Sequence, residues 1–217
     1  MMSEQGHIPD EWIVSYAAGA LGEAHALLVA THVDFHPDLQ QKVGQAEEIG
    51  GVLLGKSAPT AVNDNMLDAV MQQIDVLDGS DEDSAVVSDD DTPQPLHAYL
   101  GQSLEDLNWR TMGPGMKQVR LWSGDKGEQL WLLKAKGGTK IPAHDHGGAE
   151  MTLVLKGSYH VGEARFTPGM LEIADVDDTN HHPVIDDGED CICLVITEAP
   201  IKLHSFVGRL AQPFIGL

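Results

Sequence analysis

Two hydrophobic periodicities divide the chain. In the first 78 residues apolar side chains recur every three or four positions, the spacing of one helix face. Gly19, Pro37 and the stretch 57–63 interrupt this pattern, so it predicts four short helices, with Pro37 opening the third and Asn63 capping the fourth. The apolar sets include Trp12, Ile13, Tyr16 and Ala17, then Leu27 and Leu28, then Met66, Leu67, Val70, Met71 and Ile74. We expect a small helical bundle over residues 1–78.

Beyond residue 95 the pattern changes to short apolar runs of strand length. Glycine and proline separate these runs at intervals typical of all-β sandwiches and barrels. The interruptions are residues 113–115, 124–127, 137–138, 157, 168–169 and 186–188. Residues 96–217 are therefore expected to form an all-β domain.

The segment 79–95 fits neither pattern. It is rich in Asp, Glu and Ser, and only Val86 and Val87 form a weak apolar pair. Such a composition cannot bury enough surface to offset the entropy lost on ordering. The sequence thus predicts an α + β multidomain protein, in which a flexible acidic linker joins the helical bundle to the β domain.

Charge narrows the range of partners. The 217 residues carry 34 acidic and 13 basic side chains, a formal charge of -21. Contacts to phosphate groups need Lys and Arg, so this balance argues against direct nucleic-acid binding and favours a basic protein partner. The same acidity would also keep any cytosolic protein soluble, so charge alone does not identify the partner.

Two features of the sequence bear on the compartment. The chain has no apolar run long enough to span a membrane and no signal-peptide pattern at its start. Its two cysteines, Cys191 and Cys193, give no disulfide framework and share one face of an apolar strand, where packing is more typical than reactivity. We expect a cytoplasmic protein without membrane contact.

His144, His146 and Glu150 form the most specific chemical pattern. Side chains alternate along a strand, so the two histidines project to the same side, and Glu150 rejoins them after the Gly147-Gly148 break. Imidazole and carboxylate donors that converge in this way suit a divalent transition metal. We predict a mononuclear metal centre.

In the β domain this pattern resembles the first motif of the cupin superfamily. The matching residues are Gly138, His144-Asp145-His146, Glu150 and Gly157, with a looser second motif from Phe166-Thr167-Pro168-Gly169 to Asn180-His181-His182-Pro183. The resemblance implies a jelly-roll barrel and a fourth ligand, His181 or His182, of which we favour His181. It also implies a divalent metal, zinc first, with iron, manganese, nickel and copper open.

The alternative is a jelly roll that keeps these histidines as hydrogen-bonded interior residues without metal. Tyr159, Glu172 and Arg165 lie near the motifs in sequence, but no general base is evident beyond the ligands. His160 and His204 lie outside both motifs and are not assigned.

The helical region carries a second group of histidines. His32 and His36 are four residues apart and would share a helix face, and His25 lies seven residues before His32. Spacing alone is more typical of solvated or packing histidines than of ligands.

Residues 16–24, followed by Ala30-Thr31-His32, resemble the zinc-binding anti-sigma domain of the ChrR family. That family joins such a domain to a C-terminal cupin, the order expected here. Further matching positions are Ala58-Pro59, Cys191-Ile192-Cys193-Leu194 and Ala211-Gln212-Pro213-Phe214.

The chain departs from the family at the zinc ligands. The resemblance implies His7 and His32 as ligands, but His36 and Leu39 stand where the family has the cysteines of a Cys-x-x-Cys. Asp38 or a water would have to complete the set, and thiol-based switching is excluded at this site. A second zinc at His7, His32 and His36 is therefore expected to be weak or absent.

The resemblance implies an anti-sigma factor. Its helical domain would bind and inhibit a sigma factor of the extracytoplasmic-function class, and its metal-binding cupin would sense oxidative or photo-oxidative stress and promote release. An alternative is a metal-dependent cupin enzyme, a dioxygenase or isomerase of a small molecule. A third hypothesis is a sensor that regulates something other than a sigma factor.

Overall fold

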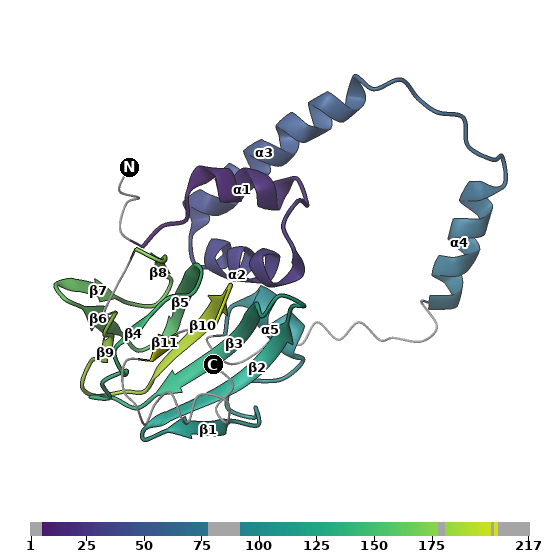
Figure 1. Cartoon of the computed structure of the whole chain (residues 1–217). Coiled ribbons are helices and arrows are strands. Elements are labelled where there is room, and N and C mark those ends of the chain that lie inside the picture. Colours follow the sequence, from purple (N-terminus) through teal and green to yellow (C-terminus); the bar gives the residue numbers. More distant parts are fainter. Residues whose placement is uncertain (1–5, 78–91, 178–180, 201, 204–217) are drawn as a thin grey trace.

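The computed structural model describes residues 6–77, 92–177, 181–200 and 202–203 (Figure 1). Its helices are α1 (Asp10–Ala17), α2 (Glu23–Asp34), α3 (Pro37–Gly55), α4 (Met66–Leu77) and α5 (Gln94–Leu100). The four helices predicted in the first 78 residues are confirmed, with Pro37 in the first turn of α3. None of the described helices combines the length and apolar character needed to cross a bilayer.

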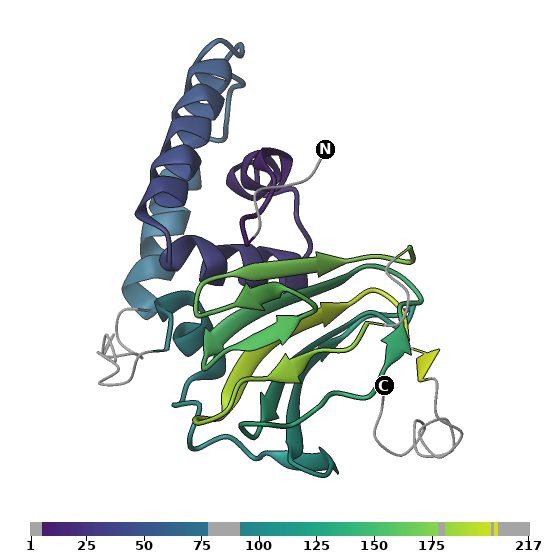
Figure 2. The same cartoon turned by 90° about the vertical axis from the view of Figure 1, so that its left-hand side faces the viewer.

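The remaining elements are short antiparallel strands, as the sequence predicts. They are β1 (Arg110–Gly113), β2 (Met116–Ser123), β3 (Gln129–Ala135), β4 (His144–Asp145), β5 (Glu150–Lys156), β6 (Tyr159–Val161), β7 (Ala164–Phe166), β8 (Leu171–Ala174), β9 (Val184–Ile185), β10 (Cys191–Thr197) and β11 (Lys202–Leu203). Six form one sheet in the order β1-β2-β3-β10-β5-β8, opposed by β7-β6-β9 and the pair β11-β4. Figure 2 shows how the sheets curve around a common interior.

Strand β10 explains why the sequence Cys191-Ile192-Cys193-Leu194-Val195-Ile196 is apolar throughout. It pairs with β3 on one side and β5 on the other. Leu194 and Ile196 pack toward the helices, while Cys193 and Val195 pack into the barrel. Both faces of the sheet are covered, so alternation of apolar and polar residues disappears.

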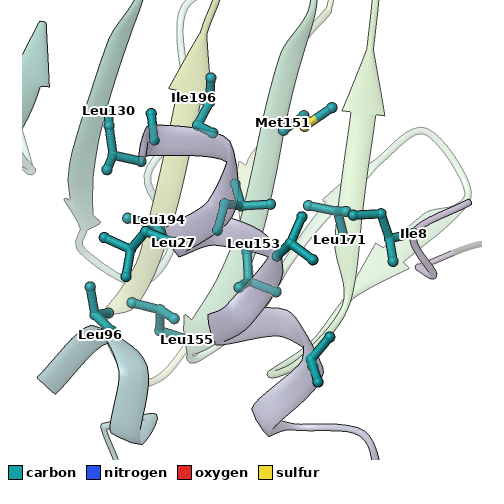
Figure 3. Close-up of a cluster of buried hydrophobic side chains, with 14 of the residues drawn as sticks. Ile8, Leu27, Leu96, Leu130, Met151, Leu153, Leu155, Leu171, Leu194 and Ile196 are labelled. Carbon is teal, nitrogen blue, oxygen red and sulfur yellow. The ribbon is translucent and has the colours of Figure 1, made fainter. Parts of the chain in front are cut away.

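One hydrophobic core joins the helices to the outer face of the large sheet. Leu27 of α2 and Leu96 of α5 pack over Leu153 of β5 and Leu194 of β10 (Figure 3). Helices α1, α2 and α3 also contact one another. The predicted helical bundle therefore shares its core with the β domain.

Part of the helical region extends away from this core. We call the end of α3 from Ile49 together with α4 the helical arm; Figure 1 shows it projecting beyond the other helices. Ten of the fourteen large hydrophobic side chains exposed in the described chain lie between Ile49 and Ile74. Among the side chains of the arm that the structure describes, up to Asp75, none belongs to the core clusters.

The expected linker falls mostly outside the described residues. Residues 78–91 are not described, so the limits 1–78, 79–95 and 96–217 stay a prediction. Thr92 and Pro93 are buried, and α5 begins at Gln94, a helix that the sequence did not predict. The matching residues 211–214 and His204 also lie outside the described residues.

Leu28→Ala tests the shared core. Leu28 is fully buried, so the change should lower the free energy of unfolding by about 2–5 kcal/mol, through lost burial and the cavity it leaves. Urea unfolding of the full chain measures this loss. Leu54→Ala, on the helical arm and 75% exposed, is the control and should cost less than about 0.5 kcal/mol. Equal effects of the two changes would contradict this packing.

Candidate metal centres

Three histidines converge inside the barrel, as predicted. His144 lies on β4 and His146 follows it directly, while His181 joins His144 through a bridge in which each backbone amide donates to the other's carbonyl, at 3.2 and 3.0 Å. One ring nitrogen from each lies within 4.8 Å of the others, and all three residues are buried. His182 is exposed, so of the two alternatives the structure places His181 in the cluster.

Glu150 lies beside this cluster at the start of β5. One carboxylate oxygen, Oε2, is 3.8 Å from His146 Nδ1. Burial raises the pKa of Glu150 to about 7; the Glu172 carboxylate adds to the rise, while His181 and Thr152 oppose it. The chain reaches Glu150 through Gly147, where a Cβ atom would lie only 2.6 Å from the Pro200 carbonyl oxygen. The predicted glycine break is therefore required by packing.

The geometry of His144 fits a metal ligand. Its Nδ1–H donates to the Pro142 carbonyl at 2.9 Å, which leaves Nε2 to face His181 Nδ1 at 3.3 Å. Burial lowers the pKa of His144 to about 4, so the imidazole is neutral near pH 7. Two nitrogens bound to zinc at tetrahedral angles lie about 3.3 Å apart. The histidine triad is thus compatible with a metal site.

Two of the three residues noted near the motifs also face the interior. Tyr159 and Glu172 form a hydrogen bond of 2.6 Å, and Glu172 contacts His181 at 3.1 Å. Arg165 instead lies on the surface, where it pairs with Asp186. No local pattern singles out Glu172 among these three residues, because its contact with His181 depends on how β8 faces the loop before β9.

The two cysteines pack inside the barrel. Their sulfur atoms are 3.6 Å apart on one face of β10, as alternation predicts. The hydrogen bond to Cys191, together with burial, raises the pKa of Cys193 well above its ordinary value. A protonated, buried thiol is a poor nucleophile, which agrees with a packing role.

A second triad lies where the helices meet the barrel. His7, His32 and His36 bring one nitrogen each within 4.8 Å of the others. His36 Nε2–H donates to the Gly169 carbonyl in the barrel at 2.8 Å, which leaves Nδ1 for the triad. The three predicted histidines are therefore brought together.

His32 is the best evidence that a cation fits this triad. It is fully buried, and neither ring nitrogen forms a hydrogen bond of normal geometry within the described part of the chain. Burial, followed by the charge of His36, lowers its pKa to about 4, against a weaker opposing effect of the Gly169 carbonyl. Buried polar atoms are rarely left unsatisfied, and a metal would satisfy the ring nitrogen of His32 that carries the lone pair.

The other residues considered for this site stand apart from the triad. Leu39 is buried and has no donor atom. Asp38 is exposed on the first turn of α3 and is not among the converging donors, so its role as fourth ligand stays a prediction. His25 packs against Trp12, with ring centroids 5.2 Å apart, and lies 3.7 Å from Glu198.

Comparisons with known proteins agree with both halves of the structure. Residues 99–200 match the family model described as the ChrR Cupin-like domain. Over 217 residues, 100% of both chains, the sequence is 40% identical to the anti-sigma-E factor ChrR of Cereibacter sphaeroides.

Two solved structures illustrate the similarity. A chain in the crystal structure of Rhodobacter sphaeroides SigE in complex with the anti-sigma ChrR matches with a TM-score of 0.74 and 38% identity, over 89% of this chain and 99% of that one. An RmlC-like cupin protein of Ralstonia eutropha matches more weakly, with a TM-score of 0.42 and 20% identity, over 48% of this chain and 71% of that one.

His146→Gln tests the barrel triad. The change removes one of three buried donors and should leave the barrel with less than about 0.1 equivalent of zinc, since three-ligand sites depend on every ligand. Metal analysis of the full chain after equilibration with zinc measures this. His160→Gln is the control, because His160 lies at the barrel surface against Asp186. Unchanged zinc content in His146→Gln would refute the barrel site.

His36→Gln tests the second triad in the same assay. If His7, His32 and His36 bind zinc, the change should remove one equivalent and leave the barrel zinc in place. His25→Gln serves as control, because His25 also lies in the helical region but outside the triad. If wild-type protein and His36→Gln hold the same amount, the triad binds no zinc.

Proposed function

The chain belongs to the ChrR family of anti-sigma factors, and from this premise we propose that it binds and inhibits a sigma factor of the extracytoplasmic-function class. Inhibition would take place in the cytoplasm, where sigma factors meet polymerase. The helical region supplies the binding surface and the barrel modulates release.

The exposed apolar face of the helical arm carries this proposal. On α4, Met66, Val70 and Ile74 recur at helical spacing on one side, with Leu67 and Met71 beside them, and all are exposed. Exposed apolar patches of this extent mark protein-binding surfaces. An amphipathic helix of this kind is suited to a hydrophobic groove on a partner.

Charge supports a sigma factor as that partner. The formal charge of this chain is -21, and a sigma factor carries basic surfaces for DNA. Attraction between opposite charges speeds the encounter of the two proteins, and repulsion between like charges disfavours acidic proteins as partners. The arm would provide apolar contact area, and the acidic surface would provide selectivity.

The barrel triad is the proposed sensing end. His144, His146 and His181, with Glu150, would hold zinc, or less readily iron, manganese, nickel or copper. A bound metal would supply an open coordination position at which an oxidant could act. The signal we propose, following the family resemblance, is oxidative or photo-oxidative stress. A second zinc at His7, His32 and His36 would tie the segment before α1 to α2 and to the start of α3.

Complex formation tests the function. The full chain and an extracytoplasmic-function sigma factor from the same genome, ideally from an adjacent gene, should co-elute as a stable one-to-one complex that blocks transcription. If no such sigma factor binds and the iron-loaded chain consumes oxygen with a small diketone, the enzyme alternative replaces this proposal.

Val70→Asp tests the arm directly. A charge in the middle of the apolar face should weaken the sigma complex at least tenfold, about 1.4 kcal/mol, through desolvation of the carboxylate. Gln72→Asp adds the same charge on the opposite face of α4 and should leave affinity within about threefold. Calorimetric titration measures both. Equal losses would show that the apolar face is not the contact surface.

A further inference from the structure

Glu172, on β8, lies between Tyr159 and a histidine of the barrel triad. It pairs with Thr152 on β5, on the sheet face that lines the barrel interior, and its side chain is 12% exposed. The phenol of Tyr159 donates to Oε2 at 2.6 Å. Burial, followed by the charge of Glu172, raises the pKa of Tyr159 well above its ordinary value, so the phenol keeps its proton. The carboxylate is thus held from one side by a fixed donor.

The other carboxylate oxygen sets the state of His181. Oε1 lies 3.1 Å from His181 Nε2, and an ionised carboxylate only accepts, so Nε2 carries the proton. In the neutral imidazole Nδ1 then has the lone pair, and it points to His144 Nε2 at 3.3 Å. The Pro142 carbonyl accepts from His144 Nδ1–H, which leaves the lone pair of His144 on Nε2. His144 Nε2 and His181 Nδ1 therefore both present lone pairs, which can bind a cation but cannot hydrogen-bond to each other.

The backbone of β8 is also held in place. β8 is an edge strand, and the Leu171 amide donates to the Gly6 carbonyl at 3.0 Å. Gly169, two residues earlier, accepts from His36 and has a φ of +85°, and an added Cβ would meet Phe35 Cβ at 3.0 Å. The helical region therefore supports the strand that carries Glu172.

We propose that Glu172 is a positioning residue for the barrel metal. Through the contacts Tyr159–Glu172–His181, Glu172 fixes the tautomer and the orientation of His181. Such outer carboxylates orient metal-bound histidines and increase their basicity. Because Gly169 and Leu171 contact the helical region, β8 and the turn before it link the metal ligands to the half of the chain that is proposed to bind the sigma factor. This inference rests on the proposed metal site and adds a residue that is not one of the predicted ligands.

Glu172→Gln tests the role, because it keeps the size of the side chain and removes the charged acceptor. Zinc affinity is measured by chelator competition on the full chain carrying His36→Gln, so that only the barrel contributes. We expect affinity to fall about 10–100-fold, with a smaller loss in Tyr159→Phe. Glu163→Gln, in the exposed turn between β6 and β7, should change nothing. Without metal, the variants should unfold at the same urea concentration as their parent.

Cobalt spectra separate positioning from ligation. Cobalt-loaded Glu172→Gln should keep the absorption pattern of its parent, because the donor atoms are unchanged. Equal zinc affinity in parent and variant would overturn the role of Glu172 alone, and a changed cobalt donor set would make it a ligand and overturn positioning. A parent that takes up no zinc in the barrel would overturn the metal site together with this role.

Discussion

Helices α2 and α5 pack against the outer face of the large sheet, and this contact determines where the other helices and the histidine triads lie. It buries Leu27, Leu28 and Leu96 with β5 and β10, and burial of this kind contributes about 25 cal/mol per Å² of apolar surface. It brings His36 to the Gly169 carbonyl. It also leaves the helical arm without a partner surface within the described chain. The molecule therefore combines a packed helix–sheet core with an arm whose apolar side chains are exposed.

Inside the barrel a different constraint acts. Buried imidazoles resist protonation, and those of His144 and His32 have pKa values lowered to about 4. With their protons on the opposite ring nitrogens, His144 Nε2 and His181 Nδ1 both present lone pairs. Two such lone pairs cannot hydrogen-bond to each other, whereas a divalent cation binds both. Both triads border the segment 169–172, one through His36 and the other through Glu172. The two proposed metal sites are therefore connected through this segment, where the helices meet the barrel.

Local patterns predicted much of this architecture from sequence alone. The helix periodicity, the break at Pro37 and the glycine-separated strands were sufficient for element type and order, and His144, His146 and His181 followed from strand alternation and family resemblance. Helix α5 was missed because Thr92 and Pro93 belong by composition to the acidic linker. The shared core and the contact of Glu172 with His181 depend on how distant elements meet, and no local pattern encodes that.

Hydrogen exchange of the full chain, with and without a bound sigma factor, shows whether the helical arm is the sigma-binding surface. We expect strong added protection on sigma binding for peptides covering residues 49–77, which include the exposed apolar side chains of the arm. Strands of the barrel should change little by comparison. Protection confined to the barrel, with residues 49–77 exchanging as fast as in the free protein, would contradict this expectation.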